Sequence, residues 1–342
     1  MTIKEAKLFP FSLKLKTPFR NSNFTINTRE GFILKLEDEI GNVSFGECSP
    51  LPGFSKETLN EAEEELSSFI NNIKSIEPSY NFDFVNASVA FCFEQALFGL
   101  QFQRDVNFKN NFVQTKKIKT NAVVGLVEIN DAIELISKKI AIGFDTFKLK
   151  VGRDNPYDDF LLIKKVRELF GYDITLRLDA NRKWNSDEAI EYLSNLQEFD
   201  IQYIEEPCDS VCGSLKTFEN INIPIALDES LTDYETALNF IETCGIEYFV
   251  IKPMMIGFNS TLKLIKEANE LGKYVIISSA FESSVGKSGL VFLASQTNHN
   301  FAHGLDTISF FEKDLVDDFY KSENSFIEFD VNNYPPKFNF HQ

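Results

Sequence analysis

The feature that most constrains this chain is a regular alternation of strand-like and helix-like segments after residue 115. Strand–helix alternation is typical of a parallel sheet, and eight such units within about 190 residues favour a closed (β/α) barrel. The strand-like segments are Ile118–Val124, Thr146–Val151, Ile174–Asp179, Ile201–Glu205, Ile225–Asp228, Tyr248–Lys252 and Tyr274–Ser278, with a weak eighth at Phe301–Asp306. The amphipathic helix-like segments are Glu128–Ile142, Tyr157–Phe170, Ser186–Leu196, Asp233–Thr243 and Ser260–Leu271. An open doubly wound sheet is the alternative, but its phosphate-binding glycine turn is missing.

The first 115 residues show a different order, in which strands come before helices. Strand character over Lys7–Leu15, Gly31–Glu37 and Asn42–Glu47 is followed by helical patterns over Lys56–Ile76 and Phe84–Phe102. This order predicts an α+β unit in front of the barrel. Its two compositionally distinct loops are Thr17–Phe24, which contains Arg20, and Ser49–Ser55, which reads Ser-Pro-Leu-Pro-Gly-Phe-Ser.

Five consecutive strand-like segments end in a charged residue. These residues are Lys150, Asp179, Glu205, Asp228 and Lys252, at intervals of 29, 26, 23 and 24 residues. Each interval is about one strand–helix unit, so all five belong at the same rim of the barrel. In barrels of this kind the C-terminal rim carries the active site. A single charged residue is usually a solvated surface group, but five in register at strand ends are not explained in that way.

Side-chain alternation predicts which of these groups point into the barrel. Lys148 and Lys150 share one face of their strand, and Phe147 and Leu149 share the other, which should meet the helices. Counted around a ring of eight, the two strands that carry Lys150 and Lys252 lie opposite each other. The three carboxylates then line the arc between the lysines. Clustered carboxylates repel one another unless a cation joins them, and oxygen-only ligands suit Mg²⁺, with Mn²⁺ as a substitute.

Composition and charge limit the classes of partner. Lys and Arg number 34 and Asp and Glu 51, which gives a formal net charge of −17. Such a chain repels phosphate backbones and anionic lipids, so we expect neither nucleic-acid nor membrane binding. No apolar run approaches the roughly 20 residues that span a bilayer. Five cysteines and an N-terminus without signal-peptide features favour the cytoplasm, and the pair Cys208 and Cys212 is interpreted as structural.

The motifs that carry these charged residues resemble those of the enolase superfamily. They are Lys-x-Lys (148–150), Leu-Asp-Ala-Asn (178–181), Ile-Glu-Glu-Pro (204–207), Leu-Asp-Glu-Ser (227–230) and Ile-Lys-Pro (251–253). They are most similar to the muconate-lactonizing subgroup, which has an α+β capping domain over a modified TIM (β/α) barrel. The resemblance implies a capping domain at 1–115, a catalytic barrel at 116–310 and a C-terminal segment, 311–342, that returns to the cap.

The same resemblance implies the roles of the charged residues. Asp179, Glu205 and Asp228 would be Mg²⁺ ligands, and Lys150 and Lys252 the acid/base pair on either side of the substrate. The common chemistry is proton abstraction next to a carboxylate, through an enediolate that Mg²⁺ stabilises. Lys148 would lower the pKa of Lys150, unless it pairs with a carboxylate. Glu206, on the opposite face from Glu205, would be structural.

Within the superfamily, the order and spacing of further motifs resemble the o-succinylbenzoate synthase family. These motifs include Arg177–Trp184, Glu205–Cys208, Ser278–Gly286 and Gly304–Thr307. The implied reaction is syn dehydration of 2-succinyl-6-hydroxy-2,4-cyclohexadiene-1-carboxylate, a dicarboxylate, in menaquinone biosynthesis. Lys150 would take the α-proton and then protonate the departing hydroxyl, and Lys252 would stabilise the enediolate from the other face. The candidates for contact with the succinyl end are Arg20, Ser278, Ser279, Ser283, Ser284 and Gly304.

Three other functions remain open at this point. N-succinylamino acid racemases and dipeptide epimerases of the same superfamily use the same metal and lysines. Dipeptide epimerases typically carry Asp-x-Asp at the eighth strand, whereas this chain has a single aspartate there, Asp306. A non-catalytic scaffold is the third alternative, but such a protein is expected to lose a ligand or a lysine, and all five are present. The oligomeric state stays open.

Overall fold

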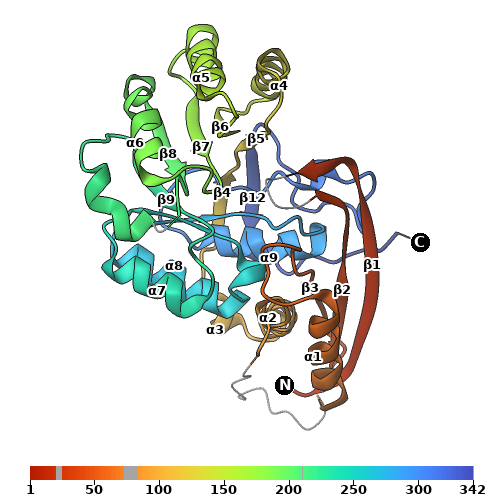
Figure 1. Cartoon of the computed structure of the whole chain (residues 1–342). Coiled ribbons are helices and arrows are strands. Elements are labelled where there is room, and N and C mark those ends of the chain that lie inside the picture. Colours follow the sequence, from red (N-terminus) through yellow and green to blue (C-terminus); the bar gives the residue numbers. More distant parts are fainter. Residues whose placement is uncertain (21–24, 73–83, 210, 342) are drawn as a thin grey trace.

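The computed structural model describes the chain except residues 21–24, 73–83, 210 and 342, and the side chains of residues 19, 20, 72, 212 and 214. Figure 1 shows an antiparallel sheet with helices, in red to orange, beside a larger assembly of strands and helices in yellow to blue. The predicted fold class, a modified (β/α) barrel with an N-terminal α+β unit, is confirmed.

The N-terminal unit is a three-stranded antiparallel sheet of order β1-β2-β3, with helices packed on it. It comprises β1 (Ile3–Arg20), β2 (Thr25–Asp38), β3 (Val43–Cys48), α1 (Leu59–Asn72), α2 (Ala87–Arg104) and α3 (Val106–Lys109). Alternate residues of β2, such as Leu34 and Leu36, are fully buried in a cluster with Val89 and Phe93 of α2. Residues 17–20 of the predicted loop continue β1, and 21–24 lie outside the described residues.

The barrel sheet has seven parallel strands in the order β11-β10-β9-β8-β7-β6-β5. They are β5 (Ala122–Val124), β6 (Thr146–Lys150), β7 (Thr175–Asp179), β8 (Ile201–Glu205), β9 (Ile225–Leu227), β10 (Tyr248–Ile251) and β11 (Tyr274–Ile277). Strands β7, β8 and β9 separate β6 from β10. The predicted order of the strands that end in charged residues is therefore the observed order in space.

Helices connect these strands on the outside of the sheet. They are α4 (Ile129–Ala141), α5 (Pro156–Phe170), α6 (Ser186–Ser194), α7 (Tyr234–Thr243), α8 (Phe258–Glu270) and α9 (Ser284–Ser295). Short 3₁₀ segments lie at Gln197–Phe199, Val211–Phe218, Pro253–Met255, Ile308–Phe310 and Val331–Asn333. The sequence prediction lacks α9 because every residue of this helix is buried, which leaves no polar face to produce a periodic pattern. Among the described residues, no helix combines the length and the apolar character needed to cross a membrane.

The eighth position of the barrel is filled by two residues rather than a strand. His303 forms a parallel bridge with Thr120, next to β5, and Gly304 forms one with Ser278, next to β11. The His303 amide donates to Lys119 O at 2.7 Å, and the Gly304 amide donates to Ile277 O at 2.9 Å. The weak eighth strand predicted at Phe301–Asp306 is thus a short link that joins the two edges of the sheet.

The predicted strand Ile118–Val124 is in fact two strands with different partners. β4 (Thr115–Lys119) pairs antiparallel with β12 (Phe326–Asp330), and only β5 joins the barrel. At the break, the Thr120 hydroxyl donates to Ser325 O at 3.0 Å. The strand-like character of a segment does not show which strand each of its residues pairs with, so the sequence did not indicate this change of partner.

The C-terminal segment after the barrel contacts both parts of the molecule. Besides the β12–β4 pair, Phe311 bridges Leu15 of β1, and the ring of Phe45 in β3 lies 6.0 Å from that of Phe338. The predicted division of the chain at residues 115 and 310 stays a prediction.

Phenylalanine rings fill the boundary between the N-terminal unit and the barrel. The ring of Phe98 in α2 lies 4.8 Å from Phe292 in α9 and 5.1 Å from Phe258 in α8. Phe102 and Phe112 join the same cluster. Aromatic pairs at these separations add stabilisation beyond the area they bury. The Phe residues at this boundary therefore fill the core.

We predict that Gly46→Ala destabilises the fold. A Cβ at Gly46 in β3 would lie 1.8 Å from the carbonyl oxygen of Cys92 in α2, and backbone cannot yield as a side-chain end can. We expect the free energy of unfolding, measured by urea denaturation, to fall by about 1–3 kcal/mol or more. Gly245→Ala is the matched control, since a Cβ there meets nothing within 4 Å. Equal stability of the two variants would contradict the close β3–α2 contact.

Candidate active site

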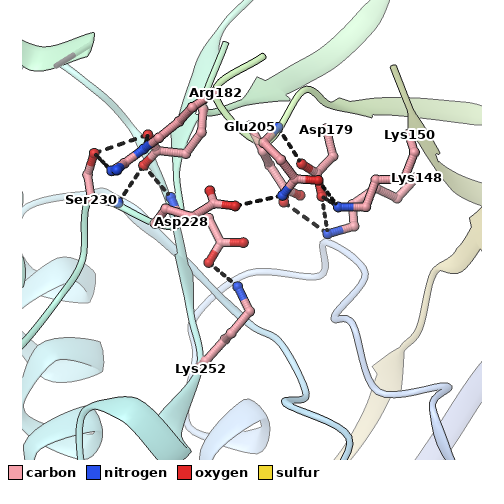
Figure 2. A network of polar contacts seen from close by, with 11 residues as sticks. Lys148, Lys150, Asp179, Arg182, Glu205, Asp228, Ser230 and Lys252 are labelled. Carbon is pink, nitrogen blue, oxygen red and sulfur yellow. Dashed lines mark hydrogen bonds and ion pairs between the residues drawn. The ribbon is translucent and has the colours of Figure 1, made fainter. Parts of the chain in front are cut away.

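Five charged side chains meet at one rim of the barrel because each ends, or directly follows, a strand of the sheet. The residues are Lys150 at the end of β6, Asp179 of β7, Glu205 of β8, Asp228 after β9 and Lys252 after β10. The strand register places Lys150 beside Asp179 and Asp179 beside Glu205. Figure 2 shows Lys252 on one side of the three carboxylates and Lys148 and Lys150 on the other.

The lysines of β6 both contact Asp179. Lys150 Nζ lies 2.7 Å from Asp179 Oδ2, and Lys148 Nζ lies 3.1 Å from the same oxygen. Lys148 also donates to Glu205 Oε2 at 2.9 Å. The pairing of Lys148 with carboxylates, which the sequence left open, is therefore present.

Lys252 approaches the cluster from the opposite side. Its ammonium group forms a hydrogen-bonded ion pair with Asp228, and the two side chains are only 10% and 7% exposed. The ring of Phe54 lies 5.1 Å from Lys252 Nζ, within reach of a cation–π contact. Phe54 belongs to the loop 49–55 of the N-terminal unit, so this unit helps to cover the barrel mouth.

Burial and mutual charge shift the pKa values of these groups. Burial, together with Asp179 and Asp228, raises the pKa of Glu205 to about 7 although Lys148 opposes the shift. Burial also acts to raise the pKa of Asp179, but Lys150 and Lys148 hold that pKa below its usual value. Burial disfavours the charge on Lys148 and on Lys252, yet the carboxylates beside them raise the pKa of both above the usual range.

The donor chemistry of the cluster suits a hard divalent cation. Asp179 and Glu205 are each 1% exposed, and one ammonium group, that of Lys148, contacts both. Buried carboxylates that lie close together repel one another, and a bound cation relieves this repulsion. Carboxylate oxygens are also the ligands that Mg²⁺ prefers. In the arrangement described, lysines occupy the carboxylate oxygens, and no three acidic, His or Cys side chains of the described residues form a ready metal cage. Metal binding would therefore require the ammonium groups to move off these oxygens.

The cluster also contains two polar residues to which the sequence analysis assigned no role. Asn181 Oδ1 accepts a hydrogen bond from Lys150 Nζ, and Asn181 Nδ2 donates to Glu229 Oε1 at 2.6 Å. Burial and the neighbouring Asp228 raise the pKa of Glu229 to about 7. Both residues belong to the motifs named above, 178–181 and 227–230. Their polar side chains so close to the strand ends could have indicated that they belong to the site.

Glu206 faces away from the cluster and fixes the backbone that carries it. Its backbone has φ +38°, and its carboxylate accepts from the amides of Asp228 at 3.0 Å and Ser230 at 2.7 Å. Arg182 Nε donates to the same carboxylate at 3.0 Å, and Figure 2 shows Arg182 and Ser230 on this side of Asp228. The structural role predicted for Glu206 is consistent with these contacts.

The serines predicted to contact substrate differ in what their hydroxyls do. Ser283 is the N-cap of α9: its hydroxyl donates to Glu47 and accepts from the Val285 amide at 3.2 Å. The Ser284 hydroxyl donates to Asp314. The Ser279 hydroxyl donates to Glu282 at 2.5 Å. These three hydroxyls are therefore bound to carboxylates of the protein itself.

Ser278 and Gly304 face each other across the closure of the barrel. A Cβ at Gly304 would lie 3.0 Å from Ser278 Oγ, so the glycine leaves room beside this hydroxyl. Ser278 is 8% exposed, and its backbone amide donates to Ile251 O at 2.9 Å. The backbone of Arg20 ends β1, whereas its side chain lies outside the described part of the chain. Of the predicted succinyl contacts, Ser278 and Gly304 therefore remain the ones that the structure leaves available.

Two family descriptions match this chain. Residues 131–332 match the family described as "Enolase C-terminal domain-like", and residues 3–100 match "MenC, N-terminal domain". The first match covers the barrel strands from β6 onward, and the second covers the three-stranded sheet with α1 and most of α2. The barrel and the N-terminal unit therefore each match a described family.

Individual relatives agree with these matches. An o-succinylbenzoate synthase of Aliivibrio fischeri (strain MJ11) is 32% identical over 317 residues, which is 92% of this chain and 93% of that protein. The L-Ala-D/L-Glu epimerase from Bacillus subtilis has a similar structure, with a TM-score of 0.86, 21% identity and 96% of each chain covered. The N-succinyl Arg/Lys racemase from Bacillus cereus ATCC 14579 superposes with a TM-score of 0.85, at 21% identity over all of both chains. At these identities the two structures show the fold alone.

We predict that Glu205 makes the stability of the metal-free protein depend on pH. Its pKa of about 7, against about 4.3 in an unfolded chain, means that the folded protein keeps a proton which the unfolded chain has released. The free energy of unfolding therefore falls as the pH rises from about 4 to about 7. Glu205→Gln removes this titration, so we expect Tm, measured in the presence of a chelator, to fall less over that range. Glu229 remains in both proteins as an internal reference, and an unchanged slope would contradict the assignment.

Proposed function

Because this chain belongs to the enolase superfamily, we propose that it is an o-succinylbenzoate synthase, which dehydrates 2-succinyl-6-hydroxy-2,4-cyclohexadiene-1-carboxylate. The observation that carries the proposal is the placement of Lys150 and Lys252 on opposite sides of three buried carboxylates at the barrel rim. The synthase of Aliivibrio fischeri, similar over 92% of the chain, supports this substrate. Menaquinone biosynthesis would be the pathway served.

The carboxylates provide the site for a divalent metal. Asp179, Glu205 and Asp228 would hold Mg²⁺, or Mn²⁺ in its place, and their oxygen-only donor set supports this choice. Bound there, the ion would act as a Lewis acid that stabilises negative charge on the substrate carboxylate. A dipeptide epimerase from Enterococcus faecalis V583 has been solved in complex with Mg. The metal in that relative supports the same ion here.

The lysines carry out the proton transfers. Lys150, as the neutral amine, removes the proton next to the carboxylate, and the electron pair of that C–H bond stays on the substrate. The C–OH bond then breaks on the same face, the ring double bond forms, and Lys150 returns its proton to the departing hydroxyl, which leaves as water. Lys252 keeps its proton and stabilises the negative charge from the other face. Asn181 accepts from Lys150 Nζ and so orients this amine.

The second carboxylate of the substrate needs a donor away from the lysines. The Ser278 hydroxyl and the open side of Gly304 lie at the closure of the barrel and suit the succinyl end. Arg20, at the end of β1, would add a positive charge from the N-terminal unit. A dicarboxylate fits this pattern better than a neutral substrate.

A second candidate, racemisation of N-succinylamino acids, is favoured by one observation. The side chains of Lys252 and Lys150 are both largely buried, 10% and 17% exposed, and stand opposite each other, so each lysine could exchange a proton on its own face. The fold shared with the N-succinyl Arg/Lys racemase agrees with this arrangement. Solvent deuterium incorporated into each enantiomer of an N-succinylamino acid would detect the activity, and no incorporation would exclude it. A dipeptide epimerase stays less favoured, because the only aspartate in the stretch 304–307 is Asp306, which pairs with Lys139 at 2.6 Å.

Replacing Lys150 tests the proposed reaction directly. We expect Lys150→Ala to lower kcat for dehydration of the cyclohexadiene by about 10²–10⁴-fold, because this amine both takes and returns the proton. The assay follows the absorbance of the aromatic product. Lys183→Ala is the matched control, since Lys183 is 45% exposed and contacts Asp154 rather than the cluster. Turnover of the Lys150 variant close to that of the control would refute the assignment, and no turnover by the wild type would refute the function.

Replacing Asp228 tests the metal site. Asp228→Asn removes one of the three proposed ligand charges, so we expect Mg²⁺ affinity to fall at least about tenfold and activity to fall with it. Titration calorimetry with Mg²⁺ measures the affinity without substrate. Asp233→Asn serves as the control, because Asp233 caps α7 and pairs with Lys56 outside the cluster. Equal Mg²⁺ affinity of the Asp228 variant and the wild type would exclude Asp228 as a ligand.

A further inference from the structure

A buried polar cluster between the N-terminal unit and the barrel takes no part in the proposed reaction. Glu47 of β3 and Arg29 of β2 come from the N-terminal unit, and Glu282 and Ser283 come from the turn between β11 and α9. All four side chains are at most 1% exposed. Burial of charged groups is unfavourable unless they are hydrogen-bonded, so the surrounding residues must supply hydrogen-bond partners for Glu47, Arg29 and Glu282.

Glu47 binds the N-terminus of α9. Its carboxylate accepts hydrogen bonds from the Ser283 amide at 3.0 Å, the Gly286 amide at 3.0 Å and the Ser283 hydroxyl. The first amides of a helix have no partner within the helix, and a carboxylate there also interacts favourably with the helix dipole. Gly286 permits the approach, because a Cβ at this position would lie 2.9 Å from Glu47 Oε2. A carboxylate of one unit therefore fixes the start of a helix in the other.

Arg29 also binds the turn between β11 and α9. Its guanidinium donates to Phe281 O at 3.4 Å and to Pro50 O at 3.0 Å, and also to Ser49 O. Phe281 has φ +63°, an unusual conformation for a residue with a side chain. Arg29 thus ties the start of the loop 49–55, which carries Phe54 over Lys252, to the turn after β11.

The turn in question begins at Ser278. Within it, Glu282 accepts from the Ser279 hydroxyl at 2.5 Å and from the Ala280 amide at 2.8 Å, and the Thr307 hydroxyl donates to Ser279 at 2.8 Å. Residues 279–282 are therefore connected by hydrogen bonds, and Ser278 directly precedes them in the chain, beside Gly304. A displacement of the start of α9 would be passed along this turn to Ser278.

We propose that Glu47 is a positioning residue for substrate binding: by holding the N-terminus of α9, it places Ser278 for contact with the succinyl end of the substrate. The inference rests on the proposed synthase function. It makes the docking of the N-terminal unit a condition for binding the distal carboxylate. Arg29, which binds both this turn and the start of the loop 49–55, links the same specificity to the position of that loop.

The molecule contains a matched contact that serves as a control. Glu94 of α2 accepts from the Asn259 amide at 2.9 Å, close to the start of α8, and so binds a different barrel helix from the same N-terminal unit. Glu94→Gln weakens the docking of the two units without touching the turn 278–283. Glu47→Gln places an amide group against backbone donors, and Gly286→Ala disturbs the same contact from the barrel side.

The experiment compares these variants in binding, catalysis and amide hydrogen exchange. For Glu47→Gln and Gly286→Ala we expect KM, and the dissociation constant of the product o-succinylbenzoate measured by calorimetry, to rise about tenfold to a hundredfold, with kcat changed much less. Binding of benzoate, which lacks the succinyl arm, and of Mg²⁺ should match the wild type. In the free protein, the amides of residues 283–286 should exchange faster in Glu47→Gln, whereas Glu94→Gln should affect only the start of α8.

A double-mutant cycle separates positioning from general destabilisation. If Glu47 acts through Ser278, the losses in product affinity caused by Glu47→Gln and Ser278→Ala are not additive, whereas independent effects add. Wild-type KM and product affinity in Glu47→Gln, or additive losses in the cycle, would overturn the inference. Failure of the wild type to convert the cyclohexadiene would instead overturn the proposed function, so the two failures are distinguishable.

Discussion

The arrangement of the site depends on charge compensation at the barrel rim. Parallel strands in register bring three carboxylates together at a place where water is largely excluded, and like charges there repel strongly. Lys148, Lys150 and Lys252 offset this repulsion from both sides. The raised pKa of Glu205 indicates that compensation is incomplete. The barrel positions these groups for chemistry at the expense of its own stability, as is common in active sites.

Besides the contact of Phe54 with Lys252 at the rim, the N-terminal unit meets the same barrel at the ends of helices. Glu47 binds the start of α9 and Glu94 the start of α8, and these helices follow the strands that lead to Ser278 and to Lys252. The phenylalanine cluster around Phe98 provides the apolar contact between these two points. Helix N-termini are therefore the structural link between a domain that covers the site and the strands that carry it.

Much of this arrangement could be predicted from the sequence because it follows from periodicity. The spacing of Lys150, Asp179, Glu205, Asp228 and Lys252 reflects repeated strand–helix units, and alternation within β6 gave the direction of Lys148 and Lys150. Features that depend on tertiary pairing were not accessible. The break at Thr120, where the chain changes from β12 to the barrel, and the reduction of the eighth strand to His303 and Gly304 leave no pattern in the sequence.

The roles of the serine hydroxyls near the site could not be predicted from the sequence either. The turn 278–284 contains four serines, and residue type alone does not distinguish a substrate donor from a helix cap. The structure distinguishes them by their partners: Ser283 and Ser284 are bound to the carboxylates of Glu47 and Asp314, which come from other parts of the chain. Long-range partners of this kind are invisible to local patterns.

The overall charge of the chain acquires a more specific meaning at the rim. A net charge of −17 disfavours polyanions at the surface, yet the proposed substrate is itself a dianion. With Lys150 as the neutral amine, the ammonium groups of Lys148 and Lys252 and a bound divalent cation would together outweigh the three carboxylates and leave the cluster positive. This positive charge would attract a dicarboxylate, while the acidic surface would exclude larger anions. The surplus of acidic residues is a property of the surface, whereas the preference for a small dianionic substrate is a property of the barrel rim with its metal bound. The two are therefore compatible.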